Sequence, residues 1–247
     1  MSSTYIVTGA SSGIGKQVCL DLAKSSHQVL AVGRDQTRTL ETLNECRRLS
    51  QAAHQMYVFD FVQDDLTKLA EQLPTVDGIV HCAGVLKIIP VRNLSRKSLV
   101  DILQVNTFAP TMLTTEMLKN NKIRHGGSVV FVSSTAATNV DKGMLAYSMS
   151  KAALDTATLG FAKEFSGSHK IRFNSVRSGY VNTPMVEKFG QLVGPDKLKE
   201  IESQRIPLGF ASPTEVSQFI QFLLSPQSAH ITGSCLKIDG GETCTLF

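Results

Sequence analysis

The sequence predicts an α/β protein, a doubly wound parallel sheet of about seven strands with helices on both faces. Short, nearly continuous apolar runs recur along the 247 residues, which is the pattern of strands buried on both faces. Segments of helical length separate these runs, and regular strand–helix alternation is typical of a parallel sheet. No repeat, low-complexity tract or linker interrupts the pattern. We therefore expect a single domain over residues 1–247.

The expected strands are 5–8 (YIVT), 28–33 (QVLAVG), 55–59 (QMYVF), 78–82 (GIVHC), 128–134 (SVVFVSS), 171–176 (IRFNSV) and 234–239 (SCLKID). The expected helices are 14–25, 37–52, 95–119 and 146–165. The segment 184–205 departs from this alternation because it is polar and contains Gly190, Gly194 and Pro195. Long insertions in compact domains often cover a site. We expect a substrate-covering segment with short helices here, and a long surface connection is the alternative.

Composition excludes several classes of protein. The chain is 42% hydrophobic and 19% charged, as in ordinary globular proteins with a sizeable core. Its net charge of +4 is scattered rather than gathered in a stripe, so no nucleic-acid partner is expected. No signal peptide or apolar run long enough to span a membrane is visible, so no membrane partner is expected. The five cysteines lack metal-ligand spacing, so we expect no metal site and a reducing, cytoplasmic location.

The first expected strand runs directly into TGASSGIG, residues 8–15, and then into a helix. Gly9 allows a tight turn off the strand, whereas Gly13 and Gly15 allow backbone and helix to approach a phosphate closely. The first amides of the helix then face an anion. This context, a strand before the glycines and a helix after them, indicates a dinucleotide-binding turn rather than a plain connection.

A second motif, AYSMSK, places Tyr147 four residues before Lys151. Positions four apart share one face of a helix. A free phenol ionises at about pH 10, and an adjacent ammonium favours the phenolate, so we expect Lys151 to lower the pKa of Tyr147. Ser134 ends the fifth expected strand, at the edge where parallel sheets bind ligands. Ser133 is the alternative, but its side chain points to the other face because side chains alternate along a strand.

The glycine-rich turn, Asn106, Ser134, Tyr147 and Lys151 occur in an order and spacing that resemble the short-chain dehydrogenase/reductase family. The resemblance covers nearly the whole chain. It implies a Rossmann-type fold and interconversion of a carbonyl and an alcohol by hydride transfer. By this resemblance Tyr147 donates the proton, and Lys151 lowers the tyrosine pKa, helped by the positive nicotinamide of the oxidised cofactor, and holds the nicotinamide ribose. Ser134 holds the substrate oxygen, and Asn106 holds a water in the proton relay.

The resemblance also implies the contacts to the cofactor. They are Gly9, Ser11, Ser12, Gly13, Ile14, Arg34, Asp60, Phe61, Ala83, Gly84, Tyr147, Lys151, Val181 and Thr183. For Asp60, a turn or helix-cap acid is a plain alternative. Two stretches depart from the family pattern. HCAG at residues 81–84 keeps only the last two residues of Asn-Asn-Ala-Gly, and Ser178-Gly179 replaces Pro-Gly.

The end of the second expected strand favours NADP(H) over NAD(H). Gly33 stands where NAD-preferring relatives carry an acid, and Arg34 follows it. Arg38 can add a second positive charge, and guanidinium groups match phosphate geometry. Ser12 argues the other way, because many NADP-dependent relatives have a basic residue there. Asp35 leaves an alternative open, an NAD-linked alcohol or polyol dehydrogenase that uses this acid for the ribose.

The function expected from the resemblance is that of an NADP-dependent oxidoreductase acting on a small-molecule carbonyl or alcohol. A non-catalytic nucleotide-binding or scaffold protein is the alternative from another class. The last helix and strand resemble elements that commonly form the family's subunit interface, so a homotetramer or homodimer is expected. The pocket-forming segments contain Val140, Met144, Met185, Val186 and Phe189, which suggests a partly hydrophobic substrate site. They do not identify the substrate.

Overall fold

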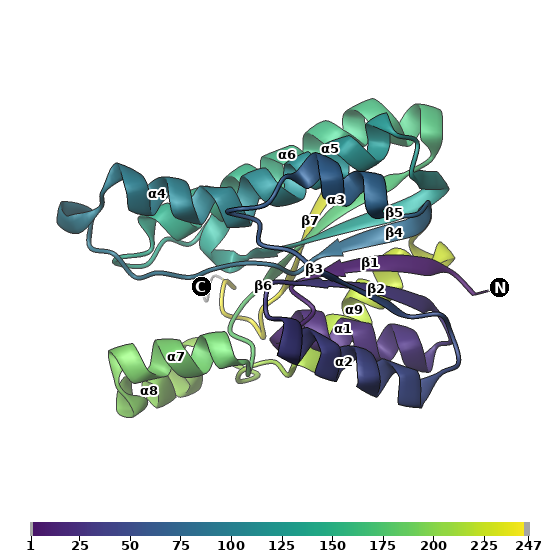
Figure 1. Cartoon of the computed structure of the whole chain (residues 1–247). Coiled ribbons are helices and arrows are strands. Elements are labelled where there is room, and N and C mark those ends of the chain that lie inside the picture. The colour runs from purple at the N-terminus through teal and green to yellow at the C-terminus, as the bar shows by residue number, and fades with distance from the viewer. Residues whose placement is uncertain (1, 245–247) are drawn as a thin grey trace.

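The computed structural model describes residues 2–244, and seven parallel strands form its single sheet (Figure 1). The strands are β1 (Thr4–Thr8), β2 (Gln28–Gly33), β3 (Gln55–Val58), β4 (Val76–His81), β5 (Ile123–Ser134), β6 (Arg172–Ser178) and β7 (Ser234–Ile238). Their order across the sheet is β3-β2-β1-β4-β5-β6-β7. From β1 the chain continues to β2 and then β3 on one side. It then returns to place β4 on the other side of β1, and β5, β6 and β7 follow in order. The predicted doubly wound sheet is confirmed, and its switch point between β1 and β4 is where such folds bind ligands.

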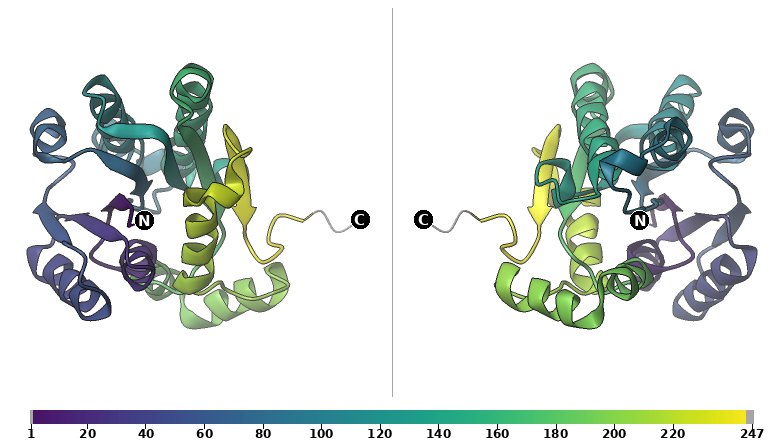
Figure 2. Two further views of the ribbon diagram at one scale, coloured as in Figure 1. Left: turned by 90° about the vertical axis from the view of Figure 1, so that its right-hand side faces the viewer. Right: turned by 90° about the vertical axis from the view of Figure 1, so that its left-hand side faces the viewer.

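Helices cover both faces of the sheet (Figure 2). The lower face in Figure 1 carries α1 (Gly13–Lys24), α2 (Gln36–Leu49) and α9 (Pro213–Leu224), and the upper face carries α3 (Leu66–Gln72), α4 (Arg96–Leu103), α5 (Ala109–Lys119) and α6 (Leu145–His169). Each face has its own apolar core. Val18, Val216 and Ile220 belong to the lower core, whereas Met117 and Phe173 belong to the upper one. The edge of the sheet at the switch point is thus held between two packed layers of helices.

The predicted helix 95–119 is interrupted. Between α4 and α5 lies a π-helical turn, Gln104–Phe108, with Asn106 fully buried inside it. In a π turn the backbone hydrogen bond spans five residues instead of the four of an α-helix, and such turns occur often at functional sites. Periodicity did not predict this interruption, because the apolar pattern continues through it. Helix α3 was missed altogether, since seven residues are too few to show a helical period.

Residues 184–205 form two helices beyond the sheet, α7 (Pro184–Val193) and α8 (Pro195–Arg205). Gly194 ends α7 with a φ of +94°, and Pro195 starts α8. Proline suits the first position of a helix because its fixed φ is already helical and its missing N–H is not needed there. The two helices pack closely at Gly190, where a Cβ would lie 2.7 Å from Leu198 Cδ2. This helical pair forms the lower left lobe in Figure 1.

Three further features of the described residues concern membrane-spanning helices, metal sites and disulfides. Between residues 2 and 244, no helix has the length and apolarity needed to cross a bilayer. The same residues hold no group of three or more His, Cys, Asp or Glu side chains placed to bind a metal ion. All five cysteines are free thiols, and Cys19 and Cys46 are buried as core residues.

Arg172 fastens β6 to the end of α9. Its guanidinium is buried and donates to the carbonyl oxygens of Leu223 at 2.7 Å, Leu224 at 3.3 Å and Ser225 at 3.1 Å. It also donates to Ser228 Oγ at 2.6 Å. The last carbonyls of a helix lack partners within the helix, so this side chain supplies them.

We expect Arg172→Met to lower the free energy of unfolding by about 3 kcal/mol, because it leaves several buried carbonyl groups without donors. Urea titration followed by circular dichroism measures this change. Arg48→Met, on the exposed surface of α2, is the matched control and should change stability by less than about 0.5 kcal/mol. Equal stability of the two variants would show that the Arg172 contacts contribute nothing.

Candidate active site

The glycine-rich turn brings three backbone segments into contact at the end of β1. Gly9 has a φ of +68°, and a Cβ there would lie 2.7 Å from the backbone nitrogen of Ala83. A Cβ at Gly15 would overlap the carbonyl oxygen of Gly9. Both positions therefore require glycine. The close approach lets α1 begin at the edge of the sheet, with its first amides directed at the cleft.

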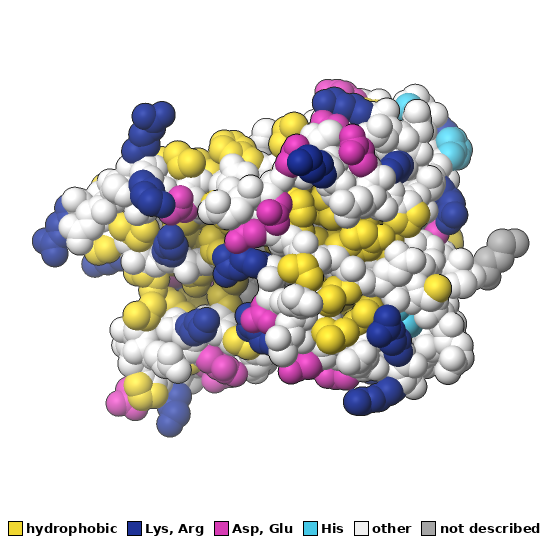
Figure 3. Space-filling view, viewed as in Figure 1, with side chains coloured by type: hydrophobic (Ala, Val, Ile, Leu, Met, Phe, Trp, Pro, Cys, Tyr) yellow, Lys and Arg dark blue, Asp and Glu magenta, His cyan; other side chains and the backbone are white. Residues whose placement is uncertain are grey.

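One cleft at this edge collects most of the predicted cofactor contacts. It is lined by Gly9, Ser11, Ser12, Gly13, Ile14, Arg34, Asp60, Phe61, Ala83, Gly84 and Thr183. Val181 lies in an adjoining cavity, together with Ser134 and Tyr147. Thr183 reaches across the cleft toward Gly13 and donates to the carbonyl of Val181 at 3.0 Å. Figure 3 shows the hollow between the α4 side and the α7–α8 lobe, with hydrophobic side chains inside it.

Sequence reasoning missed several residues of this cleft. Phe59, Cys82, Val105 and Pro184 also line it. Cys82 follows β4 directly, so its place at the carboxyl end of a central strand was a signal that could have been used. Val105 gave no such signal, because it lies in the π-helical turn.

The polar end of the cleft, beside β2, contains two arginines. The Arg34 side chain is 73% exposed, with Asp60 Oδ2 at 3.8 Å from its Nη1. Asp35 caps α2, accepting from the backbone nitrogen of Arg38 at 3.0 Å and from its Nε at 2.7 Å. These hydrogen bonds lower the pKa of Asp35. The acid is thus engaged by its own helix, whereas the Arg34 guanidinium lies largely in solvent.

Asp60 is a turn residue at the edge of the cleft. Its Oδ1 accepts from the backbone nitrogen of Val62 at 2.9 Å, as a turn acid does, and the residue also lines the cleft. The next residue, Phe61, is buried and packs edge-on against Phe59 with ring centroids 5.3 Å apart. Because the turn fixes both residues, the floor of this end of the cleft is rigid.

The HCAG departure affects the core at His81 and the cleft at Cys82. His81 Nε2 lies 2.9 Å from Thr114 Oγ1, and its ring stacks on Phe131 with centroids 5.0 Å apart. Burial lowers the pKa of His81 to about 3, so the ring is neutral. Ala83 and Gly84, the two residues that match the family, line the cleft. The histidine therefore replaces a family asparagine without reaching the cofactor side.

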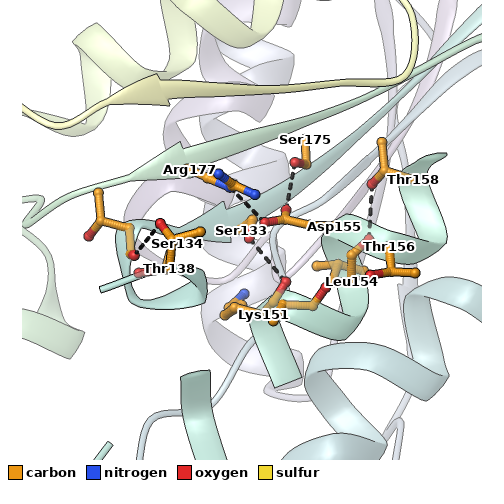
Figure 4. Close-up of polar contacts among 12 residues, drawn as sticks. Ser133, Ser134, Thr138, Lys151, Leu154, Asp155, Thr156, Thr158, Ser175 and Arg177 are labelled. Atoms are coloured by element: carbon orange, nitrogen blue, oxygen red, sulfur yellow. Dashed lines mark hydrogen bonds and ion pairs between the residues drawn. The ribbon is translucent and has the colours of Figure 1, made fainter. Parts of the chain in front are cut away.

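Tyr147 and Lys151 lie one turn apart on α6, and both are buried. Lys151 Nζ donates to the carbonyl of Val132 at 2.7 Å and lies 5.7 Å from the centre of the Tyr147 ring. Ser134 ends β5 beside them and accepts from the backbone nitrogen of Ala136 at 3.1 Å. Ser133 instead points into α6 and donates to the Lys151 carbonyl at 3.4 Å (Figure 4). The alternation along β5 thus selects Ser134 for the cavity.

The residues of the protein alone do not make Tyr147 acidic, whereas the prediction counted the positive charge of an oxidised nicotinamide together with Lys151. Burial raises the pKa of Tyr147 to about 12, and a hydrogen bond with Ser134 offsets only part of this rise. Burial also lowers the pKa of Lys151 to about 8, against the charge of Asp155. The Lys151 ammonium donates to the Val132 carbonyl, and desolvation is the largest influence on the pKa of the phenol.

Asn106 fixes the loop that follows β4. Its Oδ1 accepts from the backbone nitrogen of Val85 at 2.8 Å, and its Nδ2 donates to the Val85 carbonyl at 3.0 Å. The second Nδ2 hydrogen goes to Ser150 Oγ at 3.0 Å. Both amide hydrogens are therefore used. The side chain holds Gly84 and Val85 against α6, close to Lys151.

The adjoining cavity has an apolar and a polar wall. The apolar wall contains Leu86, Met144, Met185, Val186 and Phe189, and the polar wall contains Ser134, Asn139, Asp141, Tyr147, Tyr180 and Glu242. Of the residues expected from the sequence, Val140 does not line the cavity and is exposed instead. Tyr180 and Glu242 were missed, although each follows a strand at its carboxyl end. Ile14, Thr183 and Met185 line both spaces, so the cavity opens beside the glycine-rich turn.

Comparisons with known proteins agree with this architecture. The family model described as enoyl-(acyl carrier protein) reductase matches residues 9–243. The L-xylulose reductase of Caenorhabditis elegans is 35% identical over 96% of this chain and 94% of its own length. The 3-oxoacyl-(acyl-carrier-protein) reductase FabG of Thermotoga maritima is 31% identical over 96% of both chains.

A solved structure supports the same relationship. The putative NAD(P)-dependent gluconate 5-dehydrogenase of Beutenbergia cavernae, with NADP bound at low occupancy, superposes with a TM-score of 0.88. It is 28% identical, over 97% of this chain and 96% of that one. From the fold, the site geometry and these matches, the chain belongs to the short-chain dehydrogenase/reductase family.

Proposed function

We propose that this protein is an NADP(H)-dependent oxidoreductase that interconverts a small-molecule carbonyl and its alcohol. The observation that carries the proposal is that Ser134 and Tyr147 line the cavity beside the glycine-lined cleft, with the buried Lys151 ammonium 5.7 Å from the centre of the Tyr147 ring. The relatives named as reductases and dehydrogenases favour chemistry of the same kind. A scaffold role is less consistent with a buried, complete Tyr–Lys pair.

The residues of the cleft fit a nicotinamide dinucleotide. The turn at Gly9 and the start of α1 suit the pyrophosphate, and Asp60 with Phe61 suits the adenine end. Thr183 and the backbone of Val181 suit the carboxamide, and Lys151 suits the nicotinamide ribose. The bound nicotinamide supplies or accepts the hydride.

In the reductive direction, Ser134 donates a hydrogen bond to the substrate oxygen and Tyr147 gives it a proton. Because its pKa is about 12, the Tyr147 phenol is protonated at neutral pH and ready to donate. The reverse reaction needs the phenolate, which burial disfavours.

Asp155 supports Lys151 from one turn further along α6. It is buried, and it accepts from Ser175 Oγ at 2.6 Å and from Arg177 Nε at 2.7 Å, as Figure 4 shows. Its negative charge raises the pKa of Lys151 against burial. Two donors from β6 thus hold a carboxylate that keeps the lysine an ammonium. Asp155 is a positioning residue, since it acts through Lys151.

The cofactor assignment rests on Arg34. This guanidinium lines the cleft beside β2, and Arg38 lies next to it. The alternative acid, Asp35, has its carboxylate engaged by Arg38. The structural neighbour with NADP bound is consistent with the same choice.

Two further features belong to the proposal. The α7–α8 pair, residues 184–205, covers the substrate, since Met185, Val186 and Phe189 line the cavity from α7.

The protein assembles as a homodimer or homotetramer, for which the exposed apolar side chains of Phe108, Met112 and Met149 offer a surface. A second copy would bury these side chains.

We expect Tyr147→Phe to lower kcat at least about 1,000-fold, because it removes the proton donor but keeps the ring. Initial rates of NADPH oxidation with a ketone that the parent reduces measure the loss, and fluorescence titration should give an NADPH Kd within about twofold of the parent. Tyr57→Phe on β3 is the matched control and should keep the parent rate. A Tyr147→Phe protein with unchanged turnover would refute the mechanism.

We expect Arg34→Ala to weaken NADPH binding about 30-fold and NADH binding less than about twofold, since only NADPH carries the extra phosphate. Isothermal titration calorimetry with both cofactors measures the two constants. Arg48→Ala, at the far end of α2, serves as the charge-matched control. Equal losses for NADPH and NADH in the Arg34 variant would remove the NADP assignment.

We expect Asp155→Asn to move the alkaline limb of kcat/KM to lower pH. Asp155 raises the pKa of Lys151, which is about 8 with the carboxylate in place, so neutralising it lets the ammonium lose its proton sooner as pH rises. Ser175→Ala removes one hydrogen bond to Asp155 but keeps its charge, and should leave the limb in place. An unmoved limb in Asp155→Asn would mean that Asp155 does not support Lys151.

A further inference from the structure

Glu242 places a buried carboxylate in the wall of the cavity that contains Ser134 and Tyr147. Its side chain is 4% exposed, although it lies on the turn after β7. Oε2 accepts from Thr135 Oγ1 at 3.1 Å, and Thr135 directly follows Ser134. The carboxylate therefore lies next to the serine that binds the substrate oxygen in the proposed mechanism.

The other oxygen of this carboxylate has few partners. Within residues 2–244, Glu242 Oε1 accepts no hydrogen bond, and the Arg205 guanidinium lies 3.7 Å away. The same guanidinium lies closer to Asp141, at 3.2 Å. Burial raises the pKa of Glu242, the hydrogen bond from Thr135 and the charge of Arg205 lower it, and the charges of Asp239 and Asp141 add smaller rises, so that the net shift is upward. A buried carboxylate with unused lone pairs is costly, so a bound donor would stabilise it.

The backbone at Gly179, opposite Glu242, leaves room for the carboxylate. A Cβ at Gly179 would lie 2.9 Å from Glu242 Oε2 and 3.0 Å from Asp239 Cα. Any other residue at this position would require the Glu242 carboxylate or the Asp239 backbone to shift. The glycine after β6 thus leaves the space that the carboxylate occupies.

We propose that Glu242 is a specificity-determining residue that selects substrates carrying a hydroxyl group in addition to the reacting carbonyl. The hydroxyl donates a hydrogen bond to the Glu242 carboxylate while Ser134 and Tyr147 contact the carbonyl oxygen. The substrate class is a small neutral hydroxyketone or hydroxyaldehyde. This inference rests on the proposed function, because it requires a carbonyl compound bound in this cavity.

Other substrate classes fit the polar wall less well. An anionic substrate would meet the negative charges of Glu242 and Asp141. A cationic group at Glu242 Oε1 would lie beside Arg205 and be repelled by it. A plain hydrocarbon chain would cover the carboxylate without donating a hydrogen bond, and this desolvation is unfavourable. A neutral hydroxyl avoids all three costs.

The test compares ketones that differ by one hydroxyl group. The full-length protein is assayed with NADPH on hydroxyacetone and acetone, and on acetopropyl alcohol and methyl propyl ketone. Levulinate is the anionic analogue of the second pair. We expect kcat/KM at least about tenfold higher for the hydroxylated member of a pair, because sites built to bind a hydroxyl reject analogues that lack it. Levulinate should be the poorest substrate.

Glu242→Gln keeps the shape of the side chain and removes its charge. We expect it to reduce the hydroxyl preference at least about fivefold and to raise the relative rate with levulinate, since charge-assisted hydrogen bonds are the stronger ones. Glu164→Gln, an exposed acid on α6, is the matched control and should keep the parent preference. A purely structural role for Glu242 would lower all rates together and leave the preference intact.

Several results would overturn the inference. A parent protein without hydroxyl preference, or one that favours levulinate or the cationic ketone acetonyltrimethylammonium, contradicts it while leaving the oxidoreductase proposal standing. So does full preference in a Glu242→Gln protein that binds NADPH normally. If that variant does not fold, Glu242→Asp replaces it, and partial loss of preference supports the inference whereas full retention overturns it. Failure to reduce any of these ketones with either cofactor overturns the proposed function and the inference together.

Discussion

Burial of Tyr147 and Lys151 between the sheet and the cleft is the constraint on which the chemistry of this site depends. Desolvation favours the neutral form of each group, so it keeps the phenol protonated and weakens the ammonium. Three neighbours act against it, Ser134 on the phenol and both Asp155 and Cys82 on the lysine. The pair is therefore a protonated phenol beside a lysine with a pKa of about 8, which is compatible with the proposed proton transfer. A positively charged cofactor ring beside the phenol would be the remaining influence on its pKa.

The rigidity of this pair comes from backbone contacts that side-chain motifs do not reveal. Lys151 is held by the Val132 carbonyl on β5, and Asn106 joins the loop after β4 to Ser150 on α6. The π-helical turn directs Asn106 inward, where it is fully buried. Strand, loop and helix are thus fastened to one another within a few residues of the phenol. Positioning of this kind matters because small displacements at a reacting group cost much of the rate.

The sequence allowed correct predictions of those structural features that depend on residues close together in the chain. Strand alternation, the glycines that a close backbone approach requires, and the Tyr147–Lys151 spacing each depend on neighbouring residues, and all were located correctly. The π-helical turn and α3 were not predicted, because the apolar period continues through the first and the second is too short to show one. The rise that the residues of the chain alone cause in the pKa of Tyr147 was not predicted either. It depends on burial by β5, α6 and the cavity walls, which spacing alone does not contain. Glu242 escaped notice because its partners, Thr135 and Arg205, lie far away in the chain.

Ser178-Gly179, where the family pattern has Pro-Gly, lies between the Ser134 side of the cavity and the turn that carries Glu242. Ser178 belongs to β6, where it pairs with Ser134 of β5 on one side and Ile238 of β7 on the other. The Gly179 backbone nitrogen then donates to the Ile238 carbonyl at 3.1 Å, which aligns the turn after β7 with the cavity. A proline fixes its own φ and has no N–H, whereas serine allows the strand to continue with ordinary backbone freedom. The register of β6 and β7 thus determines how far the Asp239–Glu242 turn reaches toward Ser134. Ser134 and Tyr147 lie on β5 and α6, whereas Glu242 comes from beyond β7, so the proposed substrate selectivity can change without disturbing the proposed proton donor.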